Sequence, residues 1–388
     1  MNPSLSKILH KYTRILVFAR RKSKLKAVVL AGGFATRLRP LSCTRPKLLF
    51  PIGNKPLLDW TLEKLAKSHV KKIILAVNYM ADTLIQHYGK SKHEMKLSYS
   101  IEERPLGTGG AIKNAEKLIG DQKPFLVING DIFTNFDYTK LLEKHKKNDA
   151  IATIALYRVE DPSRYGAVEL AEKNRVAQFV EKPTRGEAPS NLINAGMYIL
   201  DPQIFDYIPS GQPVSIEREI FPKLADEKKI YGHHFKDLWI DIGEPRDYLR
   251  VNQLLLDIKI KKSQIGKNSF IESGVEIKDP TIIDEEVTIG KKSKIGPHVA
   301  IGKHVIIRKK IHIKNSVIFP QTTISDSTLI KGTIIGEGVV VGSHVKIKED
   351  CIIGDHAVIQ DNVTLTQGVT VCPFRKVSES VLTPKCLM

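Results

Sequence analysis

A six-residue repeat constrains the C-terminal third of this chain more strongly than any other feature. Isoleucine occupies every sixth position from Ile265 to Ile313, and the spacing then shifts twice and continues from Ile335 to Val371. A period of six matches neither an α-helix nor an array of hairpins. It places each sixth side chain inside a three-sided coil, with three hexads per turn. We therefore predict a left-handed parallel β-helix of about six turns within residues 259–388.

The preceding segment, residues 26–258, has a different pattern in which short apolar runs alternate with amphipathic helical segments. Three of these runs are predicted strands, at 26–31, 71–77 and 125–129. This alternation is typical of right-handed βαβ units, so we predict an α/β domain with a Rossmann-like, mostly parallel sheet. Ligands bind at the carboxyl ends of the strands in such sheets. Chemistry is therefore expected in the loops that follow Ala31 and Asn129.

The formal charge of +18 is concentrated near the N-terminus. Residues 1–58 contain thirteen lysines and arginines and no acidic residue, whereas the rest of the chain is only mildly basic. Because no basic stripe is interleaved with aromatic residues, nucleic acid is not an expected partner. Residues 1–25 form a basic N-terminal extension. A short amphipathic helix that touches a membrane or an acidic partner is one interpretation, but we favour a frayed appendage or a mis-started reading frame.

Two further classes of protein are disfavoured by composition. No apolar run approaches the roughly 18 residues that cross a bilayer, so no integral membrane association is expected. The four cysteines are widely spaced and include no Cys-x-x-Cys pair. This spacing argues against a disulfide framework and against a zinc site, and it fits a reducing cytoplasm.

The segment 28–47 combines the features of a polyphosphate site. An apolar run ends at Gly32 and Gly33, and the residues that follow carry four cations and no acid, namely Arg37, Arg39, Arg45 and Lys47. Glycines let backbone N–H groups approach an anion, and the cations neutralise phosphate oxygens. A Gly pair alone would predict only a tight turn beside a solvated basic surface. The phosphate hypothesis therefore depends on the whole string.

Two aspartates are candidate ligands for Mg²⁺. Asp131 follows the predicted strand at 125–129, and Asp241 lies in the apolar segment 239–243, where an unpaired carboxylate would be costly. A single Asp after a strand is more often an Asx-turn or a helix cap. Two such carboxylates that converge on a hard cation would instead form an oxygen-ligand site, completed by water and phosphate.

The string from Gly32 to Lys47 resembles the N-terminal signature of sugar-1-phosphate nucleotidyltransferases, the NDP-sugar pyrophosphorylases. Further motifs that match this family are FVEKP at 179–183, NAG at 194–196, SIEREIFP at 215–222 and WIDIGEPRDYL at 239–249. On its own, FVEKP would equally predict a charged edge strand that ends at proline. The resemblance extends over nearly all of residues 26–388 and is strongest to the mannose-1-phosphate guanylyltransferase branch of the family.

The resemblance implies an enzyme with the nucleotidyltransferase fold and a Mg²⁺ cofactor. Such an enzyme transfers a nucleotidyl group from an NTP, here GTP, to a sugar 1-phosphate, here mannose 1-phosphate, and releases pyrophosphate. The catalytic cations would be Arg37, Lys47 and Lys182, and the metal ligands Asp131 and Asp241. The nucleotide-binding residues would be Leu30, Ala31, Gly32, Gly33, Asn78, Glu103 and Gly107. The sugar-binding residues would be Gly166, Glu181, Lys182 and Asn194.

Two positions depart from the family pattern. Ala35 stands where the signature usually has a third glycine, and Gly130 stands where many guanylyltransferases have serine. If position 35 requires a positive φ, alanine would cost about 1 kcal/mol or more there.

Three other functions remain open from the sequence. A uridylyl- or thymidylyltransferase acting on glucose 1-phosphate would use the same chemistry, because spacing does not determine the shape of the base loop. A bifunctional enzyme would add a sugar-phosphate acetyltransferase in the β-helix, with candidate bases His298, His304, His312, His344 and His356; solvated histidines at coil corners are favoured instead. A non-catalytic regulatory subunit is disfavoured because the charged motifs are retained. β-Helices of this kind commonly pack against partner subunits, so a homo-oligomer is expected.

Overall fold

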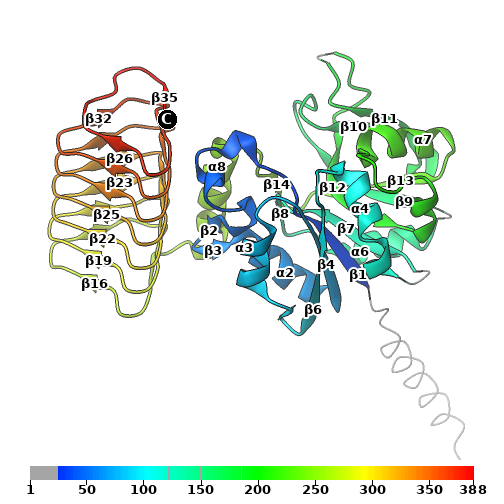
Figure 1. The fold of residues 1–388 in the computed structure, drawn as a ribbon, viewed down its shortest axis with the longest axis horizontal. Helices are drawn as coiled ribbons and strands as arrows, with labels where there is room; N and C mark the ends of the chain where they lie inside the picture. The colour runs from blue at the N-terminus through cyan, green and yellow to red at the C-terminus, as the bar shows by residue number, and fades with distance from the viewer. Residues whose placement is uncertain (1–24, 121–122, 149, 185) are drawn as a thin grey trace, which may run out of the picture.

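The computed structural model describes residues 25–120, 123–148, 150–184 and 186–388, so the prediction for residues 1–24 lies outside the described part of the chain. An α/β body and a β-helix stand side by side (Figure 1). The chain passes from the body to the β-helix after α8 (Pro245–Leu255) and a π-helix (Leu256–Ile260).

The α/β body is built on a ten-stranded mixed sheet. Its main path is β11-β10-β12-β7-β1-β4-β6-β5, with β9 paired to β12 and β13 paired to β9. Strands β7, β1, β4 and β6 are mutually parallel, and antiparallel strands extend them on both sides. The strands are β1 (Lys26–Leu30), β4 (Lys72–Val77), β5 (Ser91–Lys92), β6 (Met95–Ile101), β7 (Phe125–Asn129), β9 (Ala152–Arg158), β10 (Gly166–Leu170), β11 (Val176–Glu181), β12 (Leu192–Leu200) and β13 (Ile230–His234). The three predicted strands are confirmed as β1, β4 and β7.

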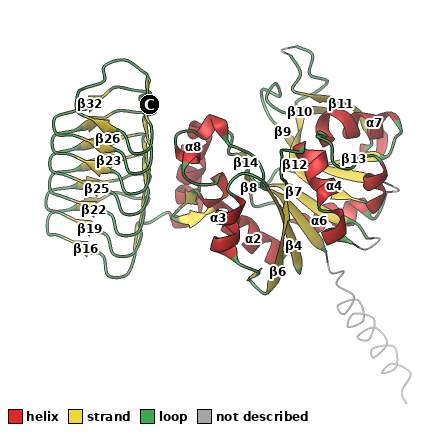
Figure 2. Ribbon diagram, viewed as in Figure 1, coloured by secondary structure: helices red, strands yellow, loops and turns green. Residues whose placement is uncertain are grey.

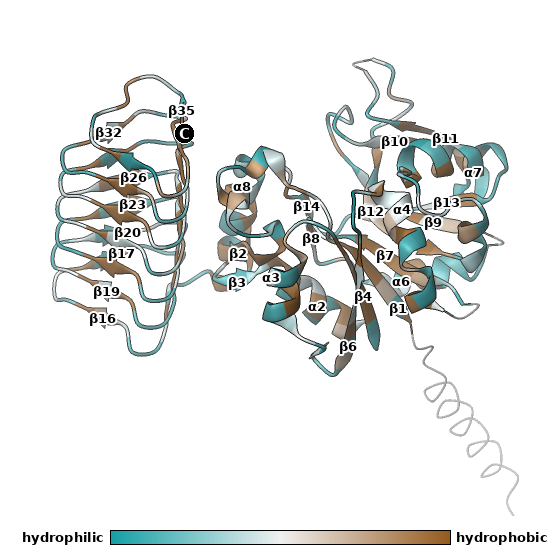
Figure 3. Ribbon diagram, viewed as in Figure 1, coloured by the Kyte–Doolittle hydropathy of each residue, from teal (hydrophilic) through white to brown (hydrophobic). Residues whose placement is uncertain are grey.

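Helices cover both faces of this sheet (Figure 2). Alternate residues of β1 enter two different cores: Val29 packs with Leu58 and Leu62 of α2, whereas Val28 packs with Ile112 of α4. Because side chains alternate along a strand, a strand that is apolar at every position must be covered on both faces. Figure 3 shows the resulting hydrophobic strands at the centre of the body. The helices are α2 (Leu57–Lys67), α3 (Ala81–Tyr88), α4 (Gly107–Asn114), α5 (Glu116–Ile119), α6 (Tyr138–His145) and α7 (Phe221–Asp226).

Two short antiparallel strand pairs lie outside the main sheet. β2 (Pro51–Ile52) pairs with β3 (Lys55–Pro56), and β8 (Ile132–Thr134) pairs antiparallel with β14 (Trp239–Asp241). The second pair joins two segments that are more than one hundred residues apart in the sequence. It places the predicted metal ligand Asp241 next to the strand that follows Asp131.

The β-helix consists of three parallel sheets. The first sheet contains β15 (Gln264–Ile265), β18 (Thr281–Ile283), β21 (Val299–Ile301), β24 (Val317–Ile318), β27 (Ile334–Ile335), β30 (Ile352–Ile353), β33 (Thr370–Val371) and β35 (Cys386–Leu387). The second contains β16 (Phe270–Ile271), β19 (Thr288–Ile289), β22 (Ile306–Ile307), β25 (Thr323–Ile324), β28 (Val340–Val341), β31 (Val358–Ile359) and β34 (Lys376–Val377). The third contains β17 (Glu276–Ile277), β20 (Lys294–Ile295), β23 (His312–Lys314), β26 (Leu329–Lys331), β29 (Lys346–Ile347) and β32 (Thr364–Leu365).

The repeat residues form the interior of the β-helix, as predicted. Ile289, Ile307, Ile324 and Val341 are buried in one continuous core. At the first coil Ile265 is half exposed, because no earlier coil covers it. The second sheet has seven strands, whereas about six turns were predicted, because Val377 follows Val371 at the same six-residue interval and continues the interior column.

The first sheet of the β-helix packs directly on the α/β body. Its outward residues Ala300, Val317, Ile334 and Ile352 are buried in the same core as β1 and α2. Phe319 lies edge-on to Phe50 (6.2 Å between ring centroids) and to Tyr248 (6.3 Å). The two parts of the chain therefore share one apolar core rather than being joined only by a linker.

Candidate active site

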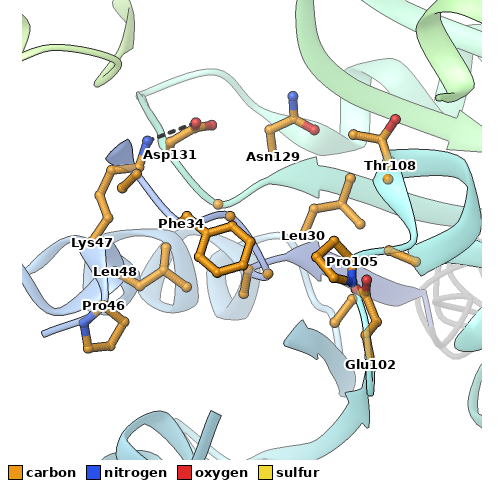
Figure 4. Close-up of a pocket in the computed structure, with 18 of the residues that line it drawn as sticks. Leu30, Phe34, Pro46, Lys47, Leu48, Glu102, Pro105, Thr108, Asn129 and Asp131 are labelled. Atoms are coloured by element: carbon orange, nitrogen blue, oxygen red, sulfur yellow. Dashed lines mark hydrogen bonds and ion pairs between the residues drawn. The ribbon is translucent and has the colours of Figure 1, made fainter. Parts of the chain in front are cut away.

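The carboxyl ends of β1 and β7 open into a cavity of about 440 Å³ (Figure 4). Most of its lining comes from four segments, around 30–37, 46–48, 102–111 and 129–131, and Ala76 and Gly243 complete it. Eight of the predicted site residues are among them: Leu30, Ala31, Gly32, Gly33, Arg37, Lys47, Gly107 and Asp131. The fold thus brings together the glycine turn, two of the four cations that follow it, and one predicted metal ligand.

The segment after β1 is shaped by close backbone approaches. The Ala31 N–H donates to the Ala76 carbonyl (2.8 Å), which continues the sheet pairing by one residue. A Cβ at Gly32 would lie 3.3 Å from Glu102 Oε1, whereas a Cβ at Gly33 would meet no atom within 4 Å. The backbone at Gly33 is therefore open toward a ligand.

Ala35 has φ +48° and ψ +44°, in the left-handed region. Position 35 therefore has the positive φ considered above, so we expect alanine to cost about 1 kcal/mol or more there relative to glycine. The Ala35 carbonyl accepts a hydrogen bond from Ser42 Oγ (2.9 Å), which closes the loop between the glycine turn and the next cationic segment.

Lys47 and Asp131 form an ion pair at one side of the cavity, drawn as a dashed line in Figure 4. Lys47 Nζ lies 2.9 Å from Asp131 Oδ2 and also donates to the Ile242 carbonyl (2.9 Å). Asp241 stands opposite Ile132 in the β8–β14 pair. Three groups predicted from distant motifs, one cation and two carboxylates, therefore meet at the carboxyl ends of β7 and β14.

The Asp131 carboxylate acts on the protonation of Asp241. Burial, followed by the negative charge of Asp131, raises the pKa of Asp241 to about 7, although Lys47 and Arg37 oppose the shift. A divalent cation between the two would relieve this repulsion. The described residues contain no group of three or more His, Cys, Asp or Glu side chains that could hold a metal. Two carboxylates still fit Mg²⁺, which usually keeps several waters and takes further oxygens from phosphate.

Arg37 reaches from the glycine loop toward Asp241. Its guanidinium lies 3.3 Å from Glu244 Oε1. Arg37 and Asp241 also approach the same glycine, because a Cβ built on Gly243 would lie 3.1 Å from Arg37 Nη2 and 3.4 Å from Asp241 Oδ2. The Arg37 side chain is 59% exposed, so the ion pair with Glu244 holds it weakly. Because Arg37 also lines the cavity, its guanidinium is accessible to an anion bound there.

The opposite end of the cavity is formed by the start of α4. Gly107 has φ +69°, and a Cβ there would lie 2.6 Å from the Val214 carbonyl, so only glycine fits. Glu102 lines this end, accepts a hydrogen bond from the Leu106 N–H (2.9 Å), and has a pKa raised by burial. The predicted residues Asn78 and Glu103 do not line the cavity: Asn78 Nδ2 donates to the Glu102 carbonyl (2.8 Å), and Glu103 is exposed.

The sugar-binding motifs meet on the antiparallel side of the sheet, outside the lining of this cavity. Gly166 pairs with Glu181 across β10 and β11, and a Cβ at Gly166 would lie 2.7 Å from Glu181 Oε2. Burial, followed by the charge of Glu217, raises the pKa of Glu181. Lys182 has φ +51°, and its N–H donates to the Tyr165 carbonyl (2.9 Å).

Asn194 is held inside β12 by its own side chain. Its Oδ1 accepts from the Gly196 N–H (3.0 Å), and its Nδ2 donates to the Tyr198 hydroxyl (2.9 Å). Trp239 links this strand to the predicted metal ligand Asp241, which follows it by two residues, because Trp239 Nε1 donates to the Ala195 carbonyl (3.0 Å). The predicted sugar and metal motifs are therefore neighbours through Trp239.

Comparison with known proteins agrees with this arrangement. Residues 26–258, which hold the whole site, match the family described as Nucleotidyl transferase. The chain belongs to the nucleotidyl transferase family. Residues 277–387, within the β-helix, match a family described as the GMPPB C-terminal domain.

Several similar proteins match this chain over more than half of its length. A mannose-1-phosphate guanyltransferase from Yarrowia lipolytica is 40% identical over 265 residues, which are 66% of this chain and 72% of that protein. The Saccharomyces cerevisiae protein of the same name is 38% identical over 265 residues, 67% of this chain and 72% of that protein. Among solved structures, HddC from Yersinia pseudotuberculosis is 36% identical with a TM-score of 0.52, and the match covers 60% of this chain and 99% of that one. A second structure, HddC complexed with GMP-PN, has a TM-score of 0.51.

Besides Glu102 and Thr108, which line the cavity, two polar residues of this nucleotidyl transferase were not singled out from the sequence. Glu217, on the π-helix Ile216–Ile220, is buried and accepts hydrogen bonds from Thr108 Oγ1 (2.5 Å) and the Tyr198 hydroxyl (3.2 Å). It therefore connects the cavity to the strand of Asn194. Asn129 lines the cavity, and its buried Oδ1 has no hydrogen-bond partner among the described residues. Glu217 belongs to the motif SIEREIFP and Asn129 ends the predicted strand at 125–129, but neither pattern indicates which polar side chain faces the site.

Proposed function

We propose that this nucleotidyl transferase converts GTP and mannose 1-phosphate into GDP-mannose and pyrophosphate. The observation that carries the proposal is the meeting of Lys47, Asp131 and Asp241 beside a cavity lined by the glycine turn. A site of this kind combines a backbone anion-binding loop with oxygen ligands for a cation. Phosphoryl and nucleotidyl transfer require both features.

The reaction needs little covalent chemistry from the protein. A phosphate oxygen of mannose 1-phosphate attacks the α-phosphorus of GTP, and the bond from that phosphorus to the bridging oxygen of pyrophosphate breaks. Because the nucleophile is already an anion, no general base is required. The protein must instead align two anions that repel each other and offset the charge on the leaving group.

We assign these tasks to the predicted residues. Arg37 and Lys47 offset charge on the departing pyrophosphate. Lys182 binds the sugar phosphate, and Glu181 and Asn194 bind sugar hydroxyls. Asp131 and Asp241 hold Mg²⁺, which when bound neutralises charge on the phosphate oxygens.

Guanine and mannose are supported by the relatives rather than by the shape of the cavity. The similar proteins from Yarrowia lipolytica and Saccharomyces cerevisiae carry the name mannose-1-phosphate guanyltransferase. HddC, 36% identical to this chain, has been solved complexed with GMP-PN. The backbone around Gly107 and Thr108 is the part of the cavity that we expect to contact the base.

We propose residues 26–258 as the catalytic domain and residues 259–388 as the β-helix domain. The helices of the described residues include none that is long and apolar enough to cross a membrane.

We propose the cytoplasm as the compartment of this protein, on the basis of its cysteines. All four cysteines are free thiols in the structure, although the fold brings Cys372 Sγ to within 3.9 Å of Cys386 Sγ. Free thiols are the usual state of cysteines in a reducing compartment.

We further propose a homo-oligomer formed through the second sheet of the β-helix. Its outward side chains carry no charge over six successive coils: Phe270, Thr288, Ile306, Thr323, Val340 and Val358. Phe270 is 61% exposed and Val340 is 43% exposed. The third sheet presents Glu276, Lys294 and Lys346 instead. Light scattering of Val340→Glu, with Lys346→Glu as the control on the third sheet, would test this: a smaller mass for the first variant alone is expected.

The function itself is tested by a substrate matrix. GTP, ATP, UTP and dTTP are each combined with mannose 1-phosphate, glucose 1-phosphate and glucosamine 1-phosphate, with and without Mg²⁺, and kcat/KM is measured from pyrophosphate release. The highest value is expected for GTP with mannose 1-phosphate and Mg²⁺. If kcat/KM is instead highest with UTP or dTTP and glucose 1-phosphate, the proposed substrates are wrong and the proposed reaction type is retained. No release with any pair would refute the proposal and favour a non-catalytic subunit.

No observation favours a second activity in the β-helix. His298 Nε2 lies 2.8 Å from Asp257 Oδ1, and His304 Nδ1 lies 2.9 Å from Glu286 Oε2. His344 and His356 have positive φ values at coil corners, whereas His312 is an outward residue of β23. These histidines lie on separate coils and face different partners, as expected for corner residues.

A further inference from the structure

A buried carboxylate of the β-helix holds the segment of the α/β body that leads to Lys47. Asp355 lies between β30 and β31 and is 1% exposed. Its Oδ2 accepts hydrogen bonds from Thr44 Oγ1 (2.6 Å) and from Nε (3.2 Å) and Nη2 (2.7 Å) of Arg45. Arg45 Nη2 also donates to Glu337 Oε2 (2.7 Å). Arg45, which belongs to the glycine-rich signature, is therefore bound by two acids of neighbouring coils. We call the cluster of Thr44, Arg45, Glu337 and Asp355 the clamp.

The clamp is fixed on the β-helix side by the coil itself. Asp355 Oδ1 accepts the Glu337 N–H (2.8 Å), so the carboxylate cannot rotate without losing a bond between coils. The Arg45 guanidinium also lies over the Phe319 ring, 5.1 Å from its centroid. A buried charge pair of this kind is costly to break, because removal of one partner leaves the other charge unpaired.

The clamped residues lie between two parts of the candidate active site. Lys47 follows Arg45 by two residues, across Pro46, and begins the 3-10 turn Lys47–Leu49. On the other side, Ser42 Oγ donates to the carbonyl of Ala35 in the glycine loop. A displacement of Thr44 and Arg45 would therefore move the Lys47 ammonium and the glycine loop together.

We propose that Asp355 and Glu337 are positioning residues for the transfer reaction: through Thr44 and Arg45, the β-helix holds Lys47 at the metal carboxylates. This inference rests on the proposed function. It gives the β-helix a direct part in catalysis within one chain, separate from its use as a contact surface between chains. Misplacement of a catalytic group by about 1 Å is enough to cost about 100-fold in rate.

The test compares Asp355→Asn with Asp361→Asn. Asp361 is a matched control because its Oδ1 accepts the Ser343 N–H (2.7 Å), the same bond between coils one hexad later. Among the described residues, Asp361 makes no hydrogen bond to the α/β body. Asp355→Asn is expected to lower kcat about 10- to 100-fold with the KM for mannose 1-phosphate changed less than about threefold, whereas Asp361→Asn keeps the wild-type kcat.

Hydrogen exchange of the peptide covering residues 41–49 gives a second readout that needs no turnover. Faster exchange there in Asp355→Asn, but not in Asp361→Asn, supports the clamp even if the wild-type protein proves inactive with every substrate pair, an outcome that would refute only the proposed function. Equal kcat values and equal exchange in the two variants would overturn the inference. If Asp355→Asn fails to fold, Thr44→Val removes a single bond of the clamp, and an unchanged kcat in that variant would overturn it as well.

Discussion

Lys47 Nζ lies 2.9 Å from Asp131 Oδ2 and 2.9 Å from the carbonyl of Ile242, so a single ammonium joins the loop after β1 to both segments that carry the proposed metal ligands. Because Ile242 directly follows Asp241, the position of this cation depends on the β8–β14 pair as well as on the glycine loop. The site is therefore assembled from elements that are distant in the sequence, and its parts can be tested one at a time.

Asp241→Asn should stabilise the protein in the absence of metal at pH 8 and abolish its response to Mg²⁺. The pKa of Asp241 is about 7 in the folded protein and 3.8 in the reference state. A carboxyl whose pKa is raised by folding contributes most to stability below the lower value, and stability falls as pH rises toward the higher one. Asparagine removes this loss because it carries no charge.

Thermal unfolding at pH 5 and pH 8, with and without Mg²⁺, measures this effect. We expect the Tm of Asp241→Asn to exceed that of the wild type at pH 8 without Mg²⁺, and we expect the wild type alone to gain stability when Mg²⁺ is added at pH 8. The exposed Asp226 provides the control variant Asp226→Asn. An equal Mg²⁺-induced shift in Asp241→Asn would show that this residue is not a ligand.

Arg37→Ala should lower kcat by at least about tenfold while the KM for mannose 1-phosphate changes little, because we assign Arg37 to the leaving pyrophosphate. Its exposed ion pair with Glu244 contributes less than about 1 kcal/mol to stability, so the variant should fold normally. Arg164→Ala is the control, since Arg164 Nη2 lies 3.6 Å from the same Glu244 carboxylate but does not line the cavity. An unchanged kcat in Arg37→Ala contradicts the assignment.

Ala35→Gly should stabilise the glycine loop. Ala35 has φ +48°, a conformation that glycine adopts without steric strain, and the relief outweighs the added freedom of the unfolded chain by about 0.5 to 1 kcal/mol. Chemical denaturation measures the difference directly. Ala31→Gly is the comparison, because Ala31 shares the loop but has no positive φ; a gain of the same size in both variants would argue against relief of strain at position 35.

Glu181→Gln should raise the KM for mannose 1-phosphate by about tenfold or more and leave the KM for GTP nearly unchanged, because the carboxylate is assigned to sugar hydroxyls. Initial rates with each substrate varied in turn provide the measurement. Glu169→Gln changes an exposed glutamate of the adjacent strand β10 and should retain both KM values. Equal effects on the two KM values would place Glu181 outside the sugar site.

Local sequence patterns predicted most of the secondary structure in this chain because the relevant interactions are short in range. The hexad period determines which side chains enter the β-helix, whatever the rest of the chain does. The glycine turn after β1 was likewise recognised, since an apolar run followed by two glycines describes a strand and its end. Ala35 shows the limit of local patterns. Its positive φ occurs in a loop that a hydrogen bond from Ser42 Oγ to the Ala35 carbonyl closes, and the residue types alone do not predict that bond.

The candidate site depended on tertiary structure wherever two distant segments meet. Asp131 and Asp241 were each recognised from a motif, but their proximity results from the pairing of β8 with β14. Glu102, and not its neighbour Glu103, lines the cavity because alternation along the chain at the end of β6 turns Glu102 inward. A motif identifies the residue types that a site needs, whereas the side that each residue faces depends on strand register.

The sequence by itself determined two architectures, a Rossmann-like α/β domain with parallel central strands and a three-sided β-helix, because both are encoded in repeating patterns of apolar residues a few positions apart. Only the tertiary structure decided how the two are joined. The contact between Arg45 and Asp355 spans 310 residues, and no local pattern marks it. Such a contact arises when surfaces from distant segments pack together and each buried charge needs a counter-charge at the interface.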